Sequence, residues 1–354
     1  MNKFAFIVHP LEFEDIKQRW PILRLLPDRF LKLFLKNLPA FKIASFKEFE
    51  SKIKAKTKGC FITCPLTSKQ LVTLNQAEVV DKIVASCQKA KKLGADIVGL
   101  GAFTAIVGDK GEKVAQRVDI PVTTGNSYTV AIALKSIELA CDILGQQLEQ
   151  KKVLVIGAAG SIGKISSLLL ADKVKKILLA DINELAVDEL GLEIAKKTKT
   201  EVITSNKIEE LIPEADIILS VSSAVNTLIN PKLLKVGSIV CDVARPRDIG
   251  KEVLAKRDDV LVLDGGIVSL PGEVKFDFDF GFPAGTVYAC MAETMILALE
   301  DKCINYSLGA NLELEKIIEI DRLALKHGFN LASLRCQNQE ISLNKINKIR
   351  QLVN

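Results

Sequence analysis

The chain has 354 residues, of which 48% are hydrophobic and 26% are charged, and its formal net charge is +5. This composition is ordinary for a folded protein with two domains, and it excludes a disordered or fibrous chain. No apolar run reaches the roughly 18 residues needed to span a bilayer, and the N-terminal run is too short for a signal peptide, so we expect a cytoplasmic protein.

Eight cysteines and two histidines restrict the chemistry that the chain can perform. The cysteines are scattered through predicted strands and helices, which in a long cytosolic chain indicates reduced thiols instead of a disulfide framework. Cys60 and Cys64 lack both a second pair and a nearby histidine, so we expect no metal site. Because His9 and His327 are the two histidines, a histidine-based catalytic triad is not expected either.

Positive charge is concentrated between residues 17 and 58, where twelve Lys or Arg face three acidic residues, a net charge of +9. Large apolar side chains lie among these cations, so the segment is either a solvated helical face over a core or a surface for a membrane or an acidic partner with an apolar cargo. Pro21, Pro27 and Pro39 divide it, which predicts short helices. Its aromatic residues follow no stacking pattern, so nucleic acid is not an expected partner.

Residues 1–146 predict an α/β substrate and acyl-binding domain. Apolar runs and helical spacing place strands at 3–8, 59–65 and 96–101 and helices at 71–93 and 130–144. A polar stretch, Thr123-Thr-Gly-Asn-Ser-Tyr-Thr129, precedes the second helix. Helix capping explains one of these side chains. We expect the others either to line a pocket and donate hydrogen bonds to a carbonyl or a nicotinamide amide, or to serve the turn alone.

The stretch Val153-Leu-Val-Ile-Gly157-Ala-Ala-Gly160-Ser-Ile-Gly163 predicts a strand, a tight turn and a helix. Gly157 can adopt the turn conformation, Gly160 leaves room for a pyrophosphate, and Gly163 allows the helix to pack close to the strand. The first N–H groups of that helix face the phosphates. A second strand ends at Asp181, eighteen residues after Gly163, near the spacing expected for a ribose-binding acid.

Strands and helices alternate through residues 147–270, which predicts a doubly wound (Rossmann) parallel sheet covered on both faces. Ligands of such sheets bind beyond the C-terminal strand ends. The residues expected to contact the cofactor there are Gly157, Gly160, Ser161, Ile162, Gly163, Asp181, Ser222, Ala244 and Gly265.

Residues 271–354 predict a C-terminal helical segment that packs back on the first domain. Its expected parts are an interdomain loop at 271–284, a helix from about Thr286, a helix at 314–327 and an amphipathic tail at 331–354.

Five motifs in this order resemble the long-chain acyl-acyl-carrier-protein reductases of the fatty-aldehyde pathway: Gly99-Leu-Gly-Ala-Phe-Thr-Ala-Ile, Thr123-Thr-Gly-Asn-Ser-Tyr-Thr, Val155-Ile-Gly-Ala-Ala-Gly-Ser-Ile-Gly, Asp264-Gly-Gly-Ile-Val and Tyr288-Ala-Cys-Met-Ala-Glu-Thr-Met. The resemblance runs from about residue 59 to Lys326-His-Gly-Phe329. It implies a substrate domain joined to a nucleotide domain, and reduction of a fatty acyl thioester to an aldehyde by a nicotinamide cofactor through a cysteine nucleophile. The cysteine of the family motif corresponds to Cys290.

The chemistry suits Cys290, because a thiolate that accepts the acyl group opens the simplest route from thioester to aldehyde. Cys290 falls in the first turns of a predicted helix, whose positive end favours thiolate. Without the resemblance, Cys290 would be interpreted as a small packed apolar residue. The candidates for stabilising the oxyanion are Thr104, Thr124, Asn126 and Ser127.

The cofactor and the acyl carrier follow from the same resemblance. Members of the family that favour NADPH carry an arginine just past the second strand, whereas this chain has Asp181-Ile182. A carboxylate there bonds ribose hydroxyls and repels a 2′-phosphate, so we expect a preference for NADH, with NADPH as the alternative. The basic segment 17–58 is expected to steer an acidic acyl carrier protein, to contact a membrane surface, or both; coenzyme A is the alternative carrier.

Two other functions stay open. A dehydrogenase of the shikimate type would reduce a small carbonyl without a covalent intermediate and needs a lysine and aspartate pair in the first domain, for which we find no convincing candidate. A non-catalytic nucleotide-binding module would bind NADH and turn over no thioester. Replacement of Cys290 by Ser separates the dehydrogenase from the reductase.

Overall fold

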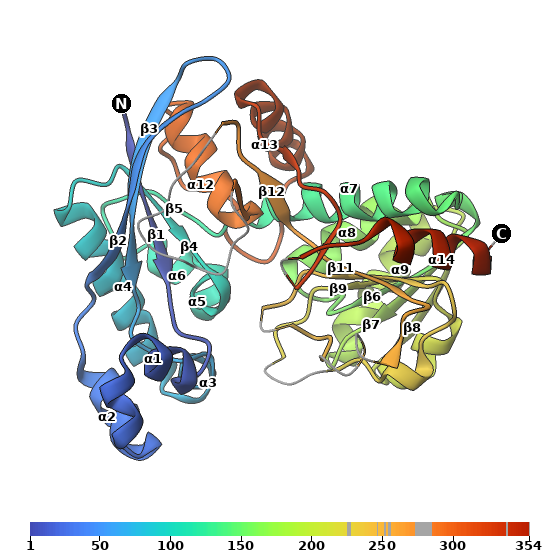
Figure 1. Ribbon diagram of the computed structural model, residues 1–354, viewed down its shortest axis with the longest axis horizontal. Coiled ribbons are helices and arrows are strands. Elements are labelled where there is room, and N and C mark those ends of the chain that lie inside the picture. The colour runs from blue at the N-terminus through green and yellow to red at the C-terminus, as the bar shows by residue number, and fades with distance from the viewer. Residues whose placement is uncertain are drawn as a thin grey trace. The chain divides into compact units, whose positions relative to one another are not determined.

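The computed structural model describes residues 1–224, 228–245, 247–250, 253, 256–272, 285–337 and 339–353 (Figure 1). The chain forms two compact units: unit 1 comprises Met1–Asn126, Leu270–Ala310 and Glu319–Asn330, and unit 2 comprises Ser127–Ser269, Asn311–Ile318 and Leu331–Asn354. The expected two-domain α/β fold is confirmed. The expected interdomain loop at 271–284 lies outside the described residues from residue 273 onward.

Unit 1 is built on a five-stranded sheet with the order β2-β3-β1-β4-β5, in which β2 runs antiparallel to β3 and the other neighbours are parallel. The strands are β1 (Lys3–Val8), β2 (Lys42–Glu50), β3 (Lys56–Thr63), β4 (Ile97–Leu100) and β5 (Val122–Thr123). The helices of this part of the chain are α1 (Phe13–Arg19), η1 (Pro21–Leu25), α2 (Asp28–Asn37), α3 (Ser68–Thr73), α4 (Gln76–Lys92), η2 (Ala102–Ala105), α5 (Val107–Lys110) and α6 (Glu112–Ala115).

The C-terminal part of the chain returns to unit 1 with a short strand and two helices. These are β13 (Thr286–Tyr288), α12 (Ala289–Leu299) and α13 (Leu314–His327), whose residues from Glu319 on belong to unit 1. The sequence predicted α13 at the same residues. The helix expected from about Thr286 begins at Ala289 instead, because Thr286, Val287 and Tyr288 are extended.

Apolar side chains cover both faces of the unit 1 sheet because successive residues of a strand point to opposite sides. Ala5 and Ile7 of β1 share a buried cluster with residues of α4. Phe4 lies on the other face, where its ring contacts Phe46 with centroids 5.3 Å apart. Helix α12 packs on this second face, over β1 and β4.

Three sequence predictions for the helices between residues 17 and 144 need correction. The single helix expected at 71–93 is two helices, because the Asn75 side chain accepts hydrogen bonds from the N–H groups of Ala77 and Glu78 and starts α4 anew. The basic segment forms short helices only as far as Asn37, and its second half is strand β2 and the start of β3. The helix expected from residue 130 is α7 (Asn126–Leu144), which begins four residues earlier.

Unit 2 contains a six-stranded parallel sheet with the order β11-β10-β9-β6-β7-β8. Its strands are β6 (Lys152–Ile156), β7 (Lys176–Ala180), β8 (Glu201–Ser205), β9 (Ile217–Ser220), β10 (Ile239–Asp242) and β11 (Leu261–Asp264). The other elements are α7, η3 (Leu148–Gln150), α8 (Ser161–Ala171), α9 (Glu184–Lys197), α10 (Ile208–Leu211), η4 (Ile212–Glu214), η5 (Pro231–Leu233) and β12 (Ile267–Ser269). The strand order reverses direction at β6, as expected for a doubly wound sheet.

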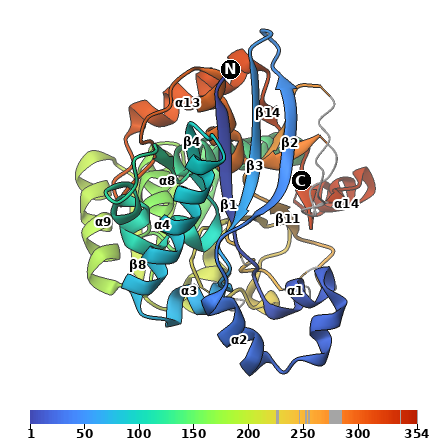
Figure 2. The ribbon, with the colours of Figure 1, turned by 90° about the vertical axis from the view of Figure 1, so that its left-hand side faces the viewer.

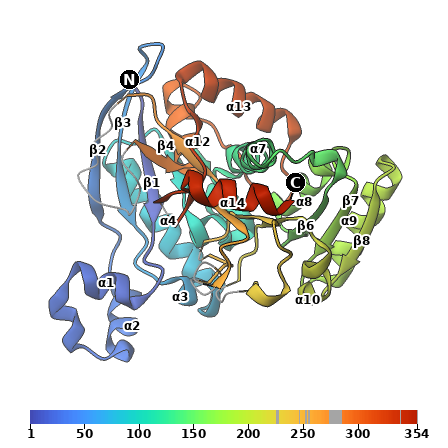
Figure 3. The same cartoon turned by 45° about the vertical axis from the view of Figure 1, so that its right-hand side comes forward.

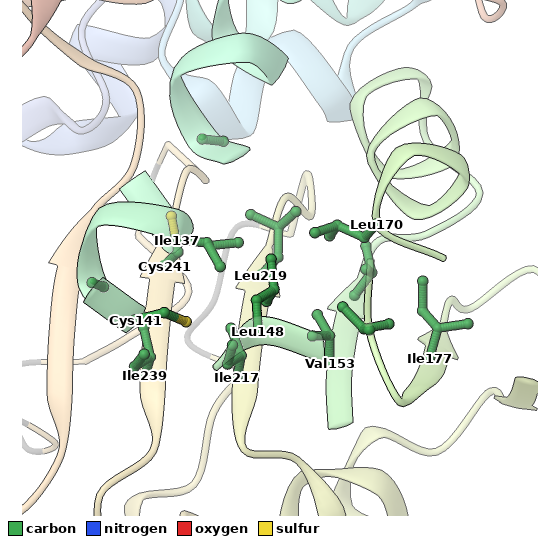
Figure 4. Close-up of a cluster of buried hydrophobic side chains, with 14 of the residues drawn as sticks. Ile137, Cys141, Leu148, Val153, Leu170, Ile177, Ile217, Leu219, Ile239 and Cys241 are labelled. Carbon is green, nitrogen blue, oxygen red and sulfur yellow. The ribbon is translucent and has the colours of Figure 1, made fainter. Parts of the chain in front are cut away.

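Alternating strand residues lie in two separate buried clusters, one on each face of this sheet. Val153, Ile177 and Leu219 lie in one cluster with α7 and α8, and Figure 4 shows their side chains meeting Ile137 and Leu170 there. The intervening strand residues, Leu154, Leu178, Ile218 and Val240, lie in the other cluster. Burial on both faces explains why these strands are continuous apolar runs.

The tail packs on unit 2. The sequence had predicted that it packs on the first domain, and this prediction is wrong. It contains β15 (Arg335–Cys336), β16 (Gln339–Glu340) and α14 (Leu343–Val353). Ile346 and Ile349 of α14, one helical turn apart, are buried in the cluster that includes α7. The units therefore divide the chain at Asn126 and assign the tail differently from the expected ranges 1–146, 147–270 and 271–354.

Through the described part of the chain, no helix combines the length and the apolar character that a membrane crossing needs.

The close packing of α12 on β4 predicts that Gly99→Ala destabilises unit 1. A Cβ atom at residue 99 would lie 2.1 Å from Thr294 Oγ1 and 2.5 Å from Phe6 Cδ2, so the helix or the ring must move. We expect a loss of roughly 1–3 kcal/mol in the free energy of unfolding, measured by urea denaturation. The double variant Gly99→Ala, Thr294→Ala should recover part of it; equal stability of Gly99→Ala and wild type would contradict the proposed packing.

Candidate active site

Cys290 is the second residue of α12 and is half-buried. The helix begins after Tyr288, and the aligned peptide dipoles of α12 give its first turn a partial positive charge. That charge stabilises a thiolate near the helix start. The position expected for Cys290 near a helix N-terminus is therefore the observed one.

Burial disfavours the thiolate form of each of the other seven cysteines. Burial raises the pKa of the Cys64 thiol to about 12 and the pKa of the Cys141, Cys303 and Cys336 thiols to about 11. Burial also raises the pKa of the thiols of Cys60, Cys87 and Cys241. At neutral pH these seven side chains are thiols, which are weak nucleophiles.

Gly125 lies directly against Cys290. Its φ of +73° is a conformation that glycine adopts readily, and a Cβ atom there would lie 2.1 Å from Cys290 Cα. The Gly125 N–H donates to Thr123 Oγ1 at 3.2 Å, and the Thr123 hydroxyl donates in turn to Glu293 Oε1. The turn after β5 is thus tied to α12 one turn after Cys290.

The hydroxyls of two expected oxyanion donors are used inside the fold. Thr104 is buried and donates to the Gly101 carbonyl at 2.7 Å. Thr124 is buried and donates to the Ser307 carbonyl. Each hydroxyl carries one proton, so neither can donate to a substrate oxygen while these bonds are made.

Asn126 and Ser127 lie in the first turn of α7, Asn126 half-buried and Ser127 buried. Asn126 directly follows Gly125 in the chain, so it shares the turn that contacts Cys290. Of the four proposed donors, Asn126 is the one that is both in this turn and partly exposed. The assignment of a catalytic part to any of the four stays a prediction.

Sequence reasoning missed Glu293, a fully buried carboxyl one turn after Cys290. A signal was present, because Glu293 is the one charged residue within Ala289–Leu299, and charged side chains are rarely buried without a partner. It also missed Tyr306, whose backbone N–H donates to the Val122 carbonyl at 3.1 Å and whose hydroxyl donates to Glu319 Oε2 at 3.0 Å. These contacts hold β5 in place, and no local sequence pattern predicts them.

The glycine turn of unit 2 has the geometry that a dinucleotide needs. Gly157 has φ of +82°, and a Cβ atom at Gly163 would lie 2.1 Å from the Gly157 carbonyl oxygen. Gly160 is the N-cap of α8 and leaves its first N–H groups without a side-chain cap, so they can receive a phosphate. Ser161, buried, and Ile162, half-buried, form the first turn of α8. These residues fit the pyrophosphate of NAD(P).

Asp181 joins this turn to the loop after β7. Its Oδ2 atom accepts from the Ala159 N–H at 3.0 Å, and its Oδ1 atom accepts from the Asn183 N–H at 3.0 Å. The carboxylate is thereby fixed beside the glycine turn, and each oxygen keeps a lone pair for a ribose hydroxyl.

The other three expected cofactor residues lie at the C-terminal ends of β9, β10 and β11. The Ser222 hydroxyl donates to Asp248 Oδ1 at 2.8 Å, the Ala244 N–H donates to Asp242 Oδ1 at 3.0 Å, and the Gly265 N–H donates to the Asp242 carbonyl at 2.8 Å. Their donors are thus used within the protein. This edge of a doubly wound sheet is where a ligand binds, but no contact of these three with a cofactor is established.

Asp242 is at the centre of a buried polar network at this edge. Its second carboxyl oxygen accepts from the Ile249 N–H at 3.1 Å. Burial raises the pKa of the Asp242 carboxyl to about 7, although the Arg245 charge opposes this. Burial also raises the pKa of Asp248, which accepts from Ser220 at 2.6 Å.

A family model described as shikimate / quinate 5-dehydrogenase matches residues 138–264. The chain is 32% identical over 361 residues to aminotransferase PigE of Serratia sp., covering 99% of this chain and 42% of that protein. It is 29% identical over 296 residues to long-chain acyl-[acyl-carrier-protein] reductase of Synechococcus elongatus, covering 78% of this chain and 82% of that protein. It is 26% identical over 224 residues to glutamyl-tRNA reductase of Methanococcus aeolicus, covering 62% of this chain and 55% of that protein.

The family model is named for a dehydrogenase and two of these relatives for reductases, and the glycine turn of this chain fits NAD(P). The chain spans less than half of the aminotransferase and about half of the glutamyl-tRNA reductase, so the names of those proteins describe longer chains. The family model covers α7 in part and the nucleotide-binding sheet, and it includes no residue of α12.

The raised pKa of Asp242 predicts a pH dependence of stability. Between about pH 4 and about pH 7 the folded chain keeps a proton that the unfolded chain has lost, so the free energy of unfolding falls as pH rises through this range. We expect this slope to be shallower in Asp242→Asn, which stays neutral, with a difference of at most roughly 4 kcal/mol. Urea unfolding at a series of pH values measures it. Asp172→Asn, at an exposed position, should keep the wild-type slope.

Proposed function

We propose that this protein reduces a fatty acyl thioester to the aldehyde with NAD(P)H, through an S-acyl intermediate on Cys290. The observation that carries the proposal is the position of Cys290 in the first turn of α12, directly against Gly125. A half-buried thiol at a helix start is suited to nucleophilic attack.

In the proposed reaction the Cys290 thiolate attacks the acyl carbonyl, and the carrier leaves as a thiolate, which takes a proton from water. NAD(P)H, when bound, supplies the hydride that reduces the acyl carbon. The Cys290 thiolate then departs from that carbon, and the aldehyde is released, so Cys290 is regenerated without a change in its oxidation state. Gly125, held by Thr123 and Glu293, positions the backbone beside the thiol.

The names of two relatives support acyl reduction as the shared chemistry. Both the long-chain acyl-[acyl-carrier-protein] reductase and the glutamyl-tRNA reductase are named for reduction of an activated acyl group. An aldehyde product also agrees with the similarity to aminotransferase PigE, because an aminotransferase needs a carbonyl acceptor. We propose a long acyl chain, carried by an acidic acyl carrier protein or by coenzyme A.

The decisive test is the trapping of the acyl group. The purified protein, incubated with palmitoyl-coenzyme A in the absence of nicotinamide cofactor, should gain the mass of one palmitoyl group, as measured by mass spectrometry of the intact chain. Cys290→Ser should gain none, whereas Cys60→Ser, which removes another half-buried thiol, should be acylated like the wild type.

Two outcomes, measured by adding NAD(P)H to the same proteins, would overturn the proposal. If Cys290→Ser kept most of the reductase activity, a dehydrogenase without a covalent intermediate would be favoured, in agreement with the family model over residues 138–264. If the protein bound NADH but neither formed the adduct nor turned over thioester, a nucleotide-binding module would be favoured.

We further propose that Asp181 gives a preference for NADH, because its fixed carboxylate repels the 2′-phosphate of NADPH. Asp181→Asn should raise the affinity for NADPH relative to that for NADH by about tenfold, as measured by fluorescence titration of each cofactor. Asp188→Asn, on the exposed face of α9, serves as the control. An unchanged ratio in Asp181→Asn would contradict this role.

A further inference from the structure

Seven large apolar side chains are exposed in one short stretch of unit 1, from the end of α1 through η1 and α2. We call them the α2 patch: Trp20, Ile22, Leu25, Leu26, Phe30, Leu33 and Phe34. Ile22 and Leu25 are 75% and 83% exposed, and η1 has no buried residue at all. Figures 2 and 3 show α1 and α2 beyond one end of the unit 1 sheet, away from the β2–β3 hairpin. Scattered exposed apolar residues are ordinary, but seven within residues 20–34 indicate an interaction surface.

Helix α2 has two distinct apolar faces. Leu31 and Leu35, one turn apart, are buried and attach the helix to unit 1, whereas Phe30, Leu33 and Phe34 recur at helical spacing on another face and are exposed. A surface helix that only covers a core needs a single apolar face. The second face is therefore free to contact something outside the chain.

Other contacts fix the orientation of the exposed face. The Gln70 side chain donates to the Lys32 carbonyl at 3.1 Å, and Lys36 pairs with Glu78 of α4 at 2.7 Å. Lys17 of α1 pairs with Asp28 at the start of α2 at 2.7 Å. These bonds, together with the burial of Leu31 and Leu35, hold α2 so that Phe30, Leu33 and Phe34 stay exposed.

Cations flank the α2 patch. Within the described part of the chain, no carboxylate lies at ion-pair distance from Arg24, Arg29 or Lys32. The Arg29 guanidinium lies over the Phe30 ring, 4.9 Å from its centroid. Arg29 and Lys32 are one turn apart on α2, beside the exposed apolar face. The patch thus combines apolar side chains with unpaired positive charge.

We propose that the α2 patch binds the surface of an anionic phospholipid bilayer, with its apolar side chains in the acyl boundary and its cations among the phosphates. Lipid headgroups complement Arg24, Arg29 and Lys32 in charge. A fluid bilayer also accepts side chains that project outward, such as Ile22 and Leu25, without a matching pocket, which a protein partner would have to provide. Membrane binding of this kind goes beyond the proposed reductase activity and does not depend on it.

Trp20 allows a direct measurement, because it is the one tryptophan of the chain and belongs to the α2 patch. Vesicles of phosphatidylcholine and phosphatidylglycerol, added to the full chain, should shift the Trp20 emission to shorter wavelength and sediment the protein. The shift should weaken with added salt and be much smaller with phosphatidylcholine alone. Lipids brominated on their acyl chains should quench Trp20, which reports insertion of the patch.

Two variants and a control separate the contributions. Ile22→Ser with Leu25→Ser removes the most exposed apolar groups without touching the core, and Arg24→Glu with Lys32→Glu reverses the charge; each pair should lower the vesicle partition coefficient by about tenfold or more. Leu192→Ser with Leu343→Ser, at positions 62% and 75% exposed in unit 2, should leave it unchanged.

Each other outcome contradicts the proposal. If vesicles left the Trp20 emission unchanged while an acidic acyl carrier protein shifted it, the patch would be a carrier-docking surface. If the emission shifted with protein concentration alone, the patch would join two copies of the chain. Because vesicle binding is measured without substrate or cofactor, its failure would leave the proposed thioester reduction intact, and the reverse also holds.

Discussion

Helix α12 lies so close to its neighbours in unit 1 that two glycines are required. A side chain at Gly99 would collide with Thr294, and a side chain at Gly125 would collide with the backbone of Cys290. The contact of Gly125 is with backbone, which no change of rotamer can relieve, so it fixes the start of α12 more firmly than side-chain packing would. The Thr123 and Glu293 hydrogen bond adds a buried polar link at the same place. The position of the Cys290 thiol depends on these contacts.

In unit 2, glycines also allow a helix to approach backbone closely, here at the cofactor site. Gly163 brings the start of α8 against the Gly157 carbonyl, and Asp181 joins the glycine turn to the next loop through two backbone N–H groups. The N–H groups of α8 are thereby held in one direction before a cofactor arrives, which is the preorganisation that anion binding requires. The acidic network around Asp242 occupies the rest of this edge, where burial makes a carboxyl hard to ionise.

The positively charged side chains of residues 17–58 have more than one structural role. The ion pair of Lys17 with Asp28 joins α1 to α2, and that of Lys36 with Glu78 joins α2 to α4. Lys56 of β3 pairs with Glu48 of the neighbouring strand β2. Arg24, Arg29 and Lys32 stay beside exposed apolar side chains, which is why we assign a surface function to this part of the segment alone.

The sequence by itself determined the class of fold, the doubly wound sheet with its glycine turn, the strand at Lys3–Val8, the helix at Leu314–His327 and the place of Cys290 near a helix start. These features depend on residues close together in the chain, whose spacing reflects local backbone geometry. Only the tertiary structure decided that Gly125 contacts Cys290, that Glu293 receives the Thr123 hydroxyl, that Thr104 and Thr124 use their protons on backbone carbonyls, and that α14 packs on unit 2. Most of these contacts join residues far apart in the sequence, and even the short-range bond of Thr104 depends on a side-chain rotamer, which hydrophobic periodicity and local propensity do not encode.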